Sequence, residues 1–162
     1  VTIDGRGGAT GASPVLLRDA TTVPTVYALH RARAFLDGCG SEMSLVMTGG
    51  FRVSSDIAKA LAMGADAVAL ASAAMVAAGC RQHRICGSDR CPEGIATQNE
   101  ELRRRFNADE AARRVANFLR CTTEELKTYA RITGHRDVHA LSLADIRTIS
   151  REISKHTDIR HA

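Results

Sequence analysis

The stretch "SLVMTGGFRVSSDIAKALAMGADAVALAS", residues 44 to 72, decides the fold. It contains a short apolar run that ends in Gly49 and Gly50, a segment with helical character from 54 to 64, and a second apolar run from 66 to 72. Apolar strands this short, separated by a helix, are typical of a parallel sheet with both faces covered. The stretch therefore predicts a β-α-β unit in an α/β protein.

The residues before this unit predict one more strand and one more helix. "VTIDG", residues 1 to 5, alternates like a strand and leads into a glycine-rich loop. Residues 21 to 38 place Val26, Leu29, Arg33 and Leu36 on one helical face. Three parallel strands are too few to close a barrel or to form a stable open sheet. We therefore expect further strands, either upstream of Val1, which is not an initiator Met, or from another chain.

The residues from 99 to 162 predict a helical tail. They are rich in helix formers, Thr122 and Glu125 have the spacing of a capping box, and Gly134 is a stop signal. The arginine runs at 103–105 and 113–114 are interleaved with acids, which is typical of a solvated helix face.

The composition limits the class of protein. The 162 residues, 44% of them hydrophobic, suffice for one ordinary globular domain. The net charge of +4 suggests a preference for anions and is too mild to indicate a nucleic-acid partner. Neither a long apolar run nor a secretory leader is present, so we expect no membrane partner and a cytoplasmic location.

Two predicted strand ends carry small residues in the pattern of an anion site. Gly49 and Gly50 follow one strand, and Ala71 and Ser72 follow the next and open a short helix. In parallel α/β proteins, ligands bind at the carboxyl ends of strands, where backbone N–H groups face an anion. We predict a phosphate site at these four residues. The alternative is that the two glycines only turn the chain.

Three cysteines are clustered in "CRQHRICGSDRCP", residues 80 to 92. Thiolates at Cys80, Cys86 and Cys91 suit an iron-sulfur cluster, whereas His83 as a fourth ligand would suit zinc. Pro92 directly after the third cysteine resembles ferredoxin motifs and favours iron slightly. Unligated thiols are the third reading. The remaining two cysteines, at 39 and 121, are predicted to be plain buried thiols.

Three segments of the chain resemble a known enzyme family. The segments "IDGRGGATGASP", "TGGFRVSSDIAKALAMGADAVALASAAMVAAGC" and "CRQHRICGSDRCPEGIATQ", in this order, resemble the carboxyl-terminal half of the FMN-binding synthase domain of glutamate synthase, of the archaeal type or a related large subunit. The specific part is the pattern Cys-x5-Cys-x4-Cys-Pro-x-Gly-x-Ala-Thr-Gln. The similarity covers the chain well up to Phe106, and the tail also resembles archaeal-type members.

The resemblance implies a fold and two cofactors. The fold class would be α/β, the carboxyl-terminal part of a TIM (β/α)8 barrel with strands six to eight. Residues 1–79 would form half-barrel units with the FMN phosphate site, 80–98 an iron-sulfur loop and 99–162 a helical extension. FMN would be held at Gly49, Gly50, Ala71 and Ser72. A 3Fe-4S cluster would be held by the cysteines at 80, 86 and 91, with His83 as a nearby loop residue.

The resemblance also implies a reaction. It would be the reduction of 2-iminoglutarate, formed from 2-oxoglutarate and ammonia, to L-glutamate, with no catalytic side chain assigned in this chain. Ammonia would come from a glutaminase domain or subunit, and electrons from a reductase subunit or ferredoxin. As half a barrel, the chain alone would bind FMN weakly and be inactive. The alternatives are an N-methylglutamate synthase-type large subunit and a non-catalytic, metal-bearing electron-transfer module.

Overall fold

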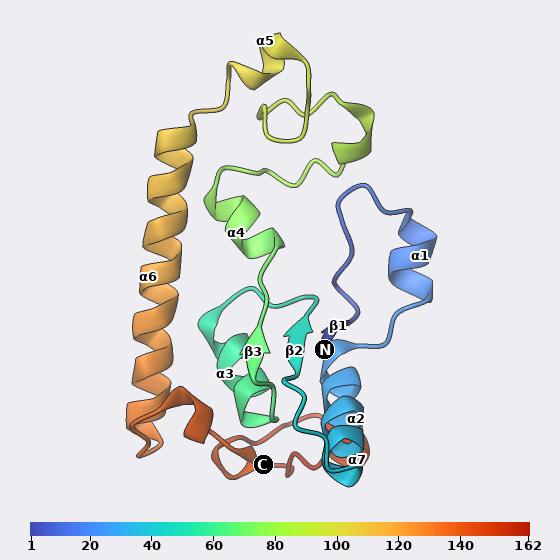
Figure 1. Cartoon of the computed structure of the whole chain (residues 1–162), viewed down its shortest axis with the longest axis vertical. Coiled ribbons are helices and arrows are strands. Elements are labelled where there is room, and N and C mark those ends of the chain that lie inside the picture. The colour runs from blue at the N-terminus through green and yellow to red at the C-terminus, as the bar shows by residue number, and fades with distance from the viewer.

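The computed structural model describes all 162 residues and shows a mixed α/β fold around a small parallel sheet (Figure 1). The sheet has the order β1-β2-β3. Ile3 lies opposite Met47 in one pair of strands, and Met47 lies opposite Val68 in the other. The strands are β1 (Thr2–Asp4), β2 (Val46–Thr48) and β3 (Ala67–Val68). All three predicted strands are therefore confirmed, together with their parallel pairing.

The chain also forms seven α-helices and three short 3-10 turns. The helices are α1 (Val15–Ala20), α2 (Thr25–Gly38), α3 (Ser54–Ala62), α4 (Ser72–Ala77), α5 (Glu100–Arg103), α6 (Ala108–Ile132) and α7 (Arg151–His156), and the turns are η1 (Cys86–Ser88), η2 (Val138–Ala140) and η3 (Leu143–Asp145). In Figure 1 the strands point towards α4 and the cysteine loop, residues 80 to 98, and α6 runs along one side of the molecule, with α5 lying beyond its upper end.

The main core lies between the central strand and the helices beside it. Leu45 and Met47 are fully buried at β2, and Leu29 and Leu36 of α2 pack in the same cluster. The predicted face of this helix is thus confirmed at Leu29 and Leu36, and Val26 on the same face is partly buried against the cluster. Ile159 near the chain end joins the cluster as well. The tail therefore anchors itself against the end of the sheet opposite the strand tips.

The long helix α6 differs from the expectation at one point. The helix begins after Asn107, whose Oδ1 accepts a hydrogen bond of 3.0 Å from the Glu110 N–H, and it ends before Gly134 at φ +83°. The predicted capping box at Thr122 is wrong, because Thr122 is buried in the middle of the helix. The stop at Gly134 is confirmed. No helix of the structure, α6 included, combines the length and apolar character needed to cross a bilayer.

Glu125, the other residue of that expected box, instead fastens α6 to α3. The buried Ser54 hydroxyl donates a hydrogen bond of 2.5 Å to Glu125 Oε2. We expect Ser54→Ala to lower the free energy of unfolding by about 0.5–1.5 kcal/mol, since it removes a hydrogen bond between α3 and α6 while the exposed Glu125 carboxylate can be hydrated instead. Urea unfolding measures this. Ser55→Ala on the same turn is the matched control and should change stability by less than about 0.5 kcal/mol. Equal losses in both variants would contradict this role.

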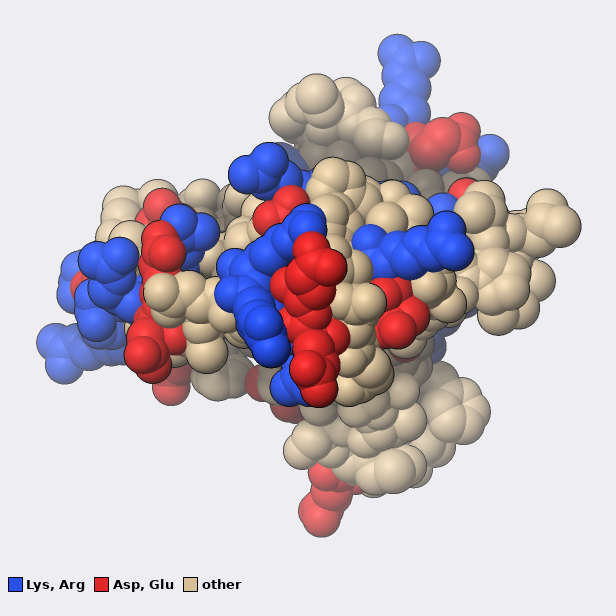
Figure 2. All heavy atoms as spheres, turned by 90° about the horizontal axis from the view of Figure 1, so that it is seen from above, with Lys and Arg blue, Asp and Glu red and all other residues tan.

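All five arginines of the two runs are exposed, as predicted, but only Arg103, Arg113 and Arg114 lie on helices, because α5 ends at Arg103 and the next two residues form a turn. Arg104 and Arg105 pair with acids four residues earlier at 3.9 and 3.7 Å, and Arg114 pairs with Glu110. Figure 2, which views the molecule from above, shows basic and acidic side chains side by side on that face. These pairs are exposed, so each contributes little to stability.

Candidate functional site

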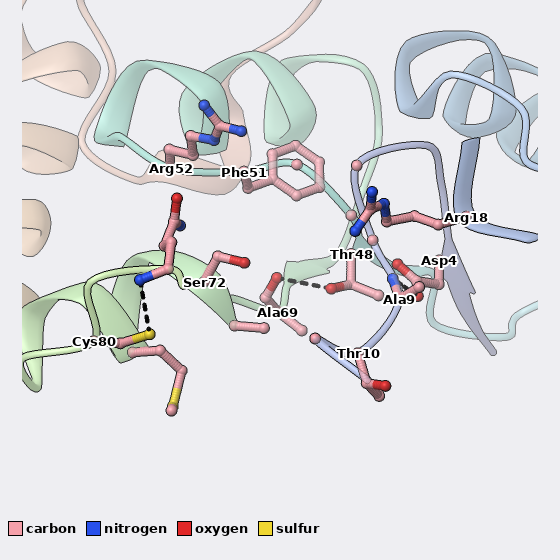
Figure 3. A pocket seen from close by; sticks show the side chains of 18 of the residues that line it. Asp4, Ala9, Thr10, Arg18, Thr48, Phe51, Arg52, Ala69, Ser72 and Cys80 are labelled. Atoms are coloured by element: carbon pink, nitrogen blue, oxygen red, sulfur yellow. Dashed lines mark hydrogen bonds between the residues drawn. The ribbon is translucent and has the colours of Figure 1, made fainter. Parts of the chain in front are cut away.

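A cavity of about 490 Å³ opens at the carboxyl ends of the three strands. It contains the four residues predicted to hold a phosphate: Gly49 and Gly50 after β2, and Ala71 and Ser72 after β3. Parallel strands end at one edge of a sheet, which is why residues more than twenty positions apart meet here. Figure 3 shows the cavity with Thr48 and Ala69 at its centre. The two predicted strand tips thus line one cavity.

The glycines at the end of β2 are required by the local backbone. Gly49 and Gly50 have φ values of +98° and +87°, a region that residues with a side chain rarely adopt. A Cβ on Gly49 would lie 2.8 Å from the Gly5 nitrogen. The Thr25 hydroxyl holds the same turn by donating to the Gly49 carbonyl at 2.7 Å. The result is a bare, fixed stretch of backbone that an anionic group can approach closely.

Asp4 at the end of β1 organises the glycine-rich loop on the other side of the cavity. Its Oδ2 accepts a hydrogen bond of 3.0 Å from the Ala9 N–H. The loop continues to Gly11, where an added Cβ would lie 2.7 Å from Cys86 Sγ. The first strand is therefore connected, through this loop, to the cysteine loop.

The three clustered cysteines occupy two environments. Cys80 and Cys86 line the cavity, whereas Cys91 is buried and is not part of the cavity lining. No three His, Cys, Asp or Glu side chains lie close enough together to hold a metal ion. The structure thus places Cys80 and Cys86 in the same cavity as the four residues predicted to hold a phosphate, and it leaves Cys91 outside this cavity.

Cys91 sits in a turn that favours its thiolate. Burial raises the pKa of the thiol, but the backbone N–H groups from Glu93 to Ala96 outweigh burial, so the pKa lies below its ordinary value. The Gly94 N–H closes the turn on the Cys91 carbonyl at 3.1 Å. Because thiolates are the metal-binding form of cysteine, the donor chemistry at Cys91 suits a metal or cluster.

Side chains within the cysteine loop hold it closed. Glu93 Oε1 lies 3.4 Å from both His83 Nε2 and Arg81 Nε, which ties the start of the loop to its end. Near the tip of the loop, the Asp89 carbonyl accepts a hydrogen bond of 2.6 Å from the Thr97 hydroxyl. His83, the alternative zinc ligand, is thus paired with a carboxylate.

The two remaining cysteines differ from the expectation. Cys39 and Cys121 were predicted to be buried, and both are exposed. Cys39 directly follows the last turn of α2, and Cys121 is exposed within α6. Helical periodicity alone did not indicate which face would be covered.

Sequence reasoning missed the arginines of the cavity. Arg18, Arg52 and Arg84 line it, and Asp4 is the one carboxylate among its lining residues. Arg52 follows the glycine pair by two residues, so its position after a strand end was a usable signal. Arg18 comes from α1 and Arg84 from the cysteine loop, and no local pattern marked either of them.

Comparisons with known proteins point to one family. The family model described as a conserved region in glutamate synthase matches residues 1–136. The chain is 41% identical over 143 residues to the archaeal glutamate synthase (NADPH) of Methanocaldococcus jannaschii, covering 87% of this chain and 28% of that protein. It is 39% identical over 161 residues to the archaeal-type glutamate synthase (NADPH) of Thermotoga neapolitana, covering 96% of this chain and 31% of that protein.

A third relative has a different name. The chain is 34% identical over 170 residues to a glutamate synthase large subunit-like protein of Rhizobium meliloti, covering 94% of this chain and 38% of that protein. The chain therefore spans well under half the length of each of these three relatives.

Proposed function

The chain belongs to the glutamate synthase family, and we propose that it is part of an FMN- and iron-sulfur-dependent glutamate synthase. The reaction would reduce 2-iminoglutarate, formed from 2-oxoglutarate and ammonia, to L-glutamate. The observation that carries the proposal is the cavity at the strand tips, which joins the glycine cradle to Cys80 and Cys86. A flavin beside an electron-carrying cluster needs this proximity.

We propose that residues 1–79 form strands six to eight of a TIM barrel with their helices, followed by an iron-sulfur loop at 80–98 and a helical extension at 99–162. Three parallel strands with consecutive neighbours support this arrangement. So does α1, whose residues Val15, Leu16 and Leu17 are exposed here and would be covered in a larger assembly.

The residues at the strand tips suit the phosphate of FMN. Backbone at Gly49, Gly50, Ala71 and Ser72 would approach the phosphate, and Arg52 would supply a balancing charge. The Arg52 N–H donates to Asp56 Oδ2 at 3.1 Å, which fixes the backbone of this residue at the cavity. Figure 3 shows both Arg52 and Ser72 at the cavity, with the Arg52 guanidinium group directed away from Ser72. These residues would bind and orient the cofactor.

We propose Cys80, Cys86 and Cys91 as the ligands of a 3Fe-4S cluster. The cavity position of the first two thiols and the thiolate-favouring turn at the third support this set. When bound, the cluster would supply electrons and FMN would supply a hydride to the imine carbon. His83, which pairs with Glu93, would stay outside the ligand set.

The partners of the reaction follow from this proposal. Ammonia would arrive free or from a glutaminase domain or subunit, and electrons from a reductase subunit or ferredoxin. A second candidate is an N-methylglutamate synthase-type activity, which the similarity to a large subunit-like relative keeps open. A non-catalytic electron-transfer module would carry the metal without the flavin.

An assay on the complete gene product decides between these functions. The protein, with chemically reduced flavin, is incubated with 2-oxoglutarate plus ammonia, and in parallel with methylamine plus L-glutamate. We expect glutamate to form in the first mixture. N-methylglutamate in the second mixture alone would favour the second candidate, and no product in either would favour the module.

A thiol footprint tests the ligand set independently of activity. In the anaerobic, cluster-loaded protein, iodoacetamide should modify the exposed Cys39 and Cys121 and spare the three loop cysteines. After the iron is removed by chelation, Cys86 should react at a rate close to that of Cys121, and Cys91 should stay slow because it is buried. Mass spectrometry of the digested protein gives the rates. Modification of Cys86 at the same rate before and after chelation would contradict the assignment.

A further inference from the structure

A run of backbone N–H groups after β2 has no acceptor within the chain. The N–H groups of Gly49, Gly50 and Phe51 make no hydrogen bond to the protein. The Ala69 carbonyl, just after β3, accepts the Thr48 hydroxyl at 3.1 Å, the contact that is dashed in Figure 3. Gly49 is buried, and buried backbone N–H groups are rarely left without a partner. Because all three residues line the cavity, this stretch suits a bound group that is rich in acceptors.

The Thr25 hydroxyl holds the carbonyl of the same stretch from the other side. Thr25 is the first residue of α2, and its hydroxyl donates to the Gly49 carbonyl at 2.7 Å. The Arg6 carbonyl is a second, weaker acceptor for this hydroxyl at 3.3 Å. Thr25 is half-buried and is not one of the residues that line the cavity. The Gly49 carbonyl is therefore held on the side that faces away from the cavity.

This contact sets the orientation of the peptide bond between Gly49 and Gly50. The bond is trans, and in a planar trans peptide the C=O and N–H groups point in opposite directions. With the carbonyl held by Thr25, the Gly50 N–H is directed towards the cavity.

Two glycines make the opposite orientation accessible as well. Gly49 and Gly50 have positive φ values, and glycine adopts φ values of either sign at little cost. A peptide that turned over would direct the negative end of its dipole, the carbonyl oxygen, at an anion bound in the cavity. The hydrogen bond from Thr25 favours the orientation that presents the N–H group.

We propose that Thr25 is a positioning residue, which fixes the peptide between Gly49 and Gly50 with its N–H group towards the phosphate of a bound flavin nucleotide. The inference rests on the proposed function, because FMN is taken from there. Thr25 would not touch the phosphate and would act only through this peptide. Valine has nearly the shape of threonine without the hydroxyl, whereas serine keeps the hydroxyl. These two substitutions therefore separate the hydrogen bond from the shape of the side chain.

The test compares FMN with riboflavin, which has the same ring system and no phosphate. Quenching of flavin fluorescence on titration with the complete apoprotein gives both Kd values. We expect Thr25→Val to bind FMN about 5- to 30-fold more weakly and to change riboflavin binding by less than about twofold. Thr25→Ser should bind FMN within about threefold of the unmodified protein. Equal weakening of FMN and riboflavin by the valine variant, or FMN binding as weak in the serine variant as in the valine variant, would overturn the inference.

Thr133→Val is the matched control. The Thr133 hydroxyl donates to the Tyr129 carbonyl at 2.9 Å at the end of α6, and this residue is also half-buried. Loss of the hydroxyl there should leave both flavin affinities unchanged. Thermal melting of each variant shows that it is folded. The same loss of FMN affinity in the control would also overturn the inference.

The outcomes separate this inference from the proposed function. If the unmodified protein binds FMN but forms no glutamate, the proposed function fails, and the flavin titrations still decide the role of Thr25. If it binds no flavin, the proposed function fails as well, and inorganic phosphate becomes the probe, followed by the line width of its phosphorus NMR signal. Weaker phosphate binding by the valine variant than by the serine variant would then sustain the inference. Equal binding by all variants, or no binding by any, would overturn it.

Discussion

Cys86→Ser is expected to abolish the proposed iron-sulfur cluster of the complete gene product, and with it any transfer of electrons to the proposed flavin. A serine hydroxyl is a poor ligand for iron in such clusters, which are held by thiolates. Serine is nearly the same size as cysteine, and residue 86 is exposed in a short turn, so the fold should be retained. Iron analysis, the electron paramagnetic resonance signal and turnover measure the loss. We expect all three to fall to background.

Cys121→Ser on the outer face of α6 is the matched control for this change. It removes another exposed thiol, at a position far along the chain from the loop, and should retain iron, signal and turnover. A variant at Cys86 with unchanged iron content would show that this residue is not a ligand. A loss of iron from both variants would indicate a general effect of thiol removal.

Gly49→Ala is expected to weaken FMN binding by roughly tenfold to hundredfold. The new Cβ would lie 2.8 Å from the Gly5 nitrogen and 2.9 Å from Asp4 Oδ1, so the cradle must move. The φ of +98° adds strain of about 1–3 kcal/mol, and each 1.4 kcal/mol corresponds to a factor of ten in affinity. Quenching of flavin fluorescence on titration of the apoprotein gives the Kd.

The control for this change is Gly38→Ala at the end of α2. An added Cβ there meets no atom within 4 Å, and its backbone is helical. Flavin affinity should be unchanged, and the helix should be slightly stabilised. Thermal melting of both variants separates a local effect at the cradle from unfolding. A Gly49 variant that stays folded and binds FMN as tightly as the unmodified protein would remove the cradle from the flavin site.

The sequence predicts the sheet and α2 best, because there the hydrophobic pattern of the sequence matches the packing of the core. The apolar runs at β2 and β3 and the face of α2 were visible because their residues enter one core, with Leu29 and Met47 in the same cluster. The cavity followed from them, since strands that run in parallel end together. Local pattern and global fold are consistent in this region.

The tail and the thiols were harder to predict, for physical reasons. Thr122 has the sequence of a helix start, but it is buried inside α6, where Glu125 meets Ser54 of α3. This contact joins residues 71 positions apart and leaves no local signature. The exposure of Cys121 depends on which face of α6 finds a partner, and that too is decided by tertiary packing.

The arginines of the cavity show where sequence reasoning fails. Arg18 comes from α1 and Arg84 from the cysteine loop, and only the fold brings them to one cavity. Arg52, by contrast, follows a recognisable strand end. Residues placed by secondary structure are predictable from the sequence, and residues gathered by loops are not.

The cofactor content of the complete gene product, purified without oxygen, tests the proposed flavin and cluster most directly. We expect bound FMN, identified after release by chromatography, together with iron and the broad visible absorbance of a cluster. Both should be present in the same preparation. Zinc in place of iron, in a protein that takes up no flavin, would contradict this expectation.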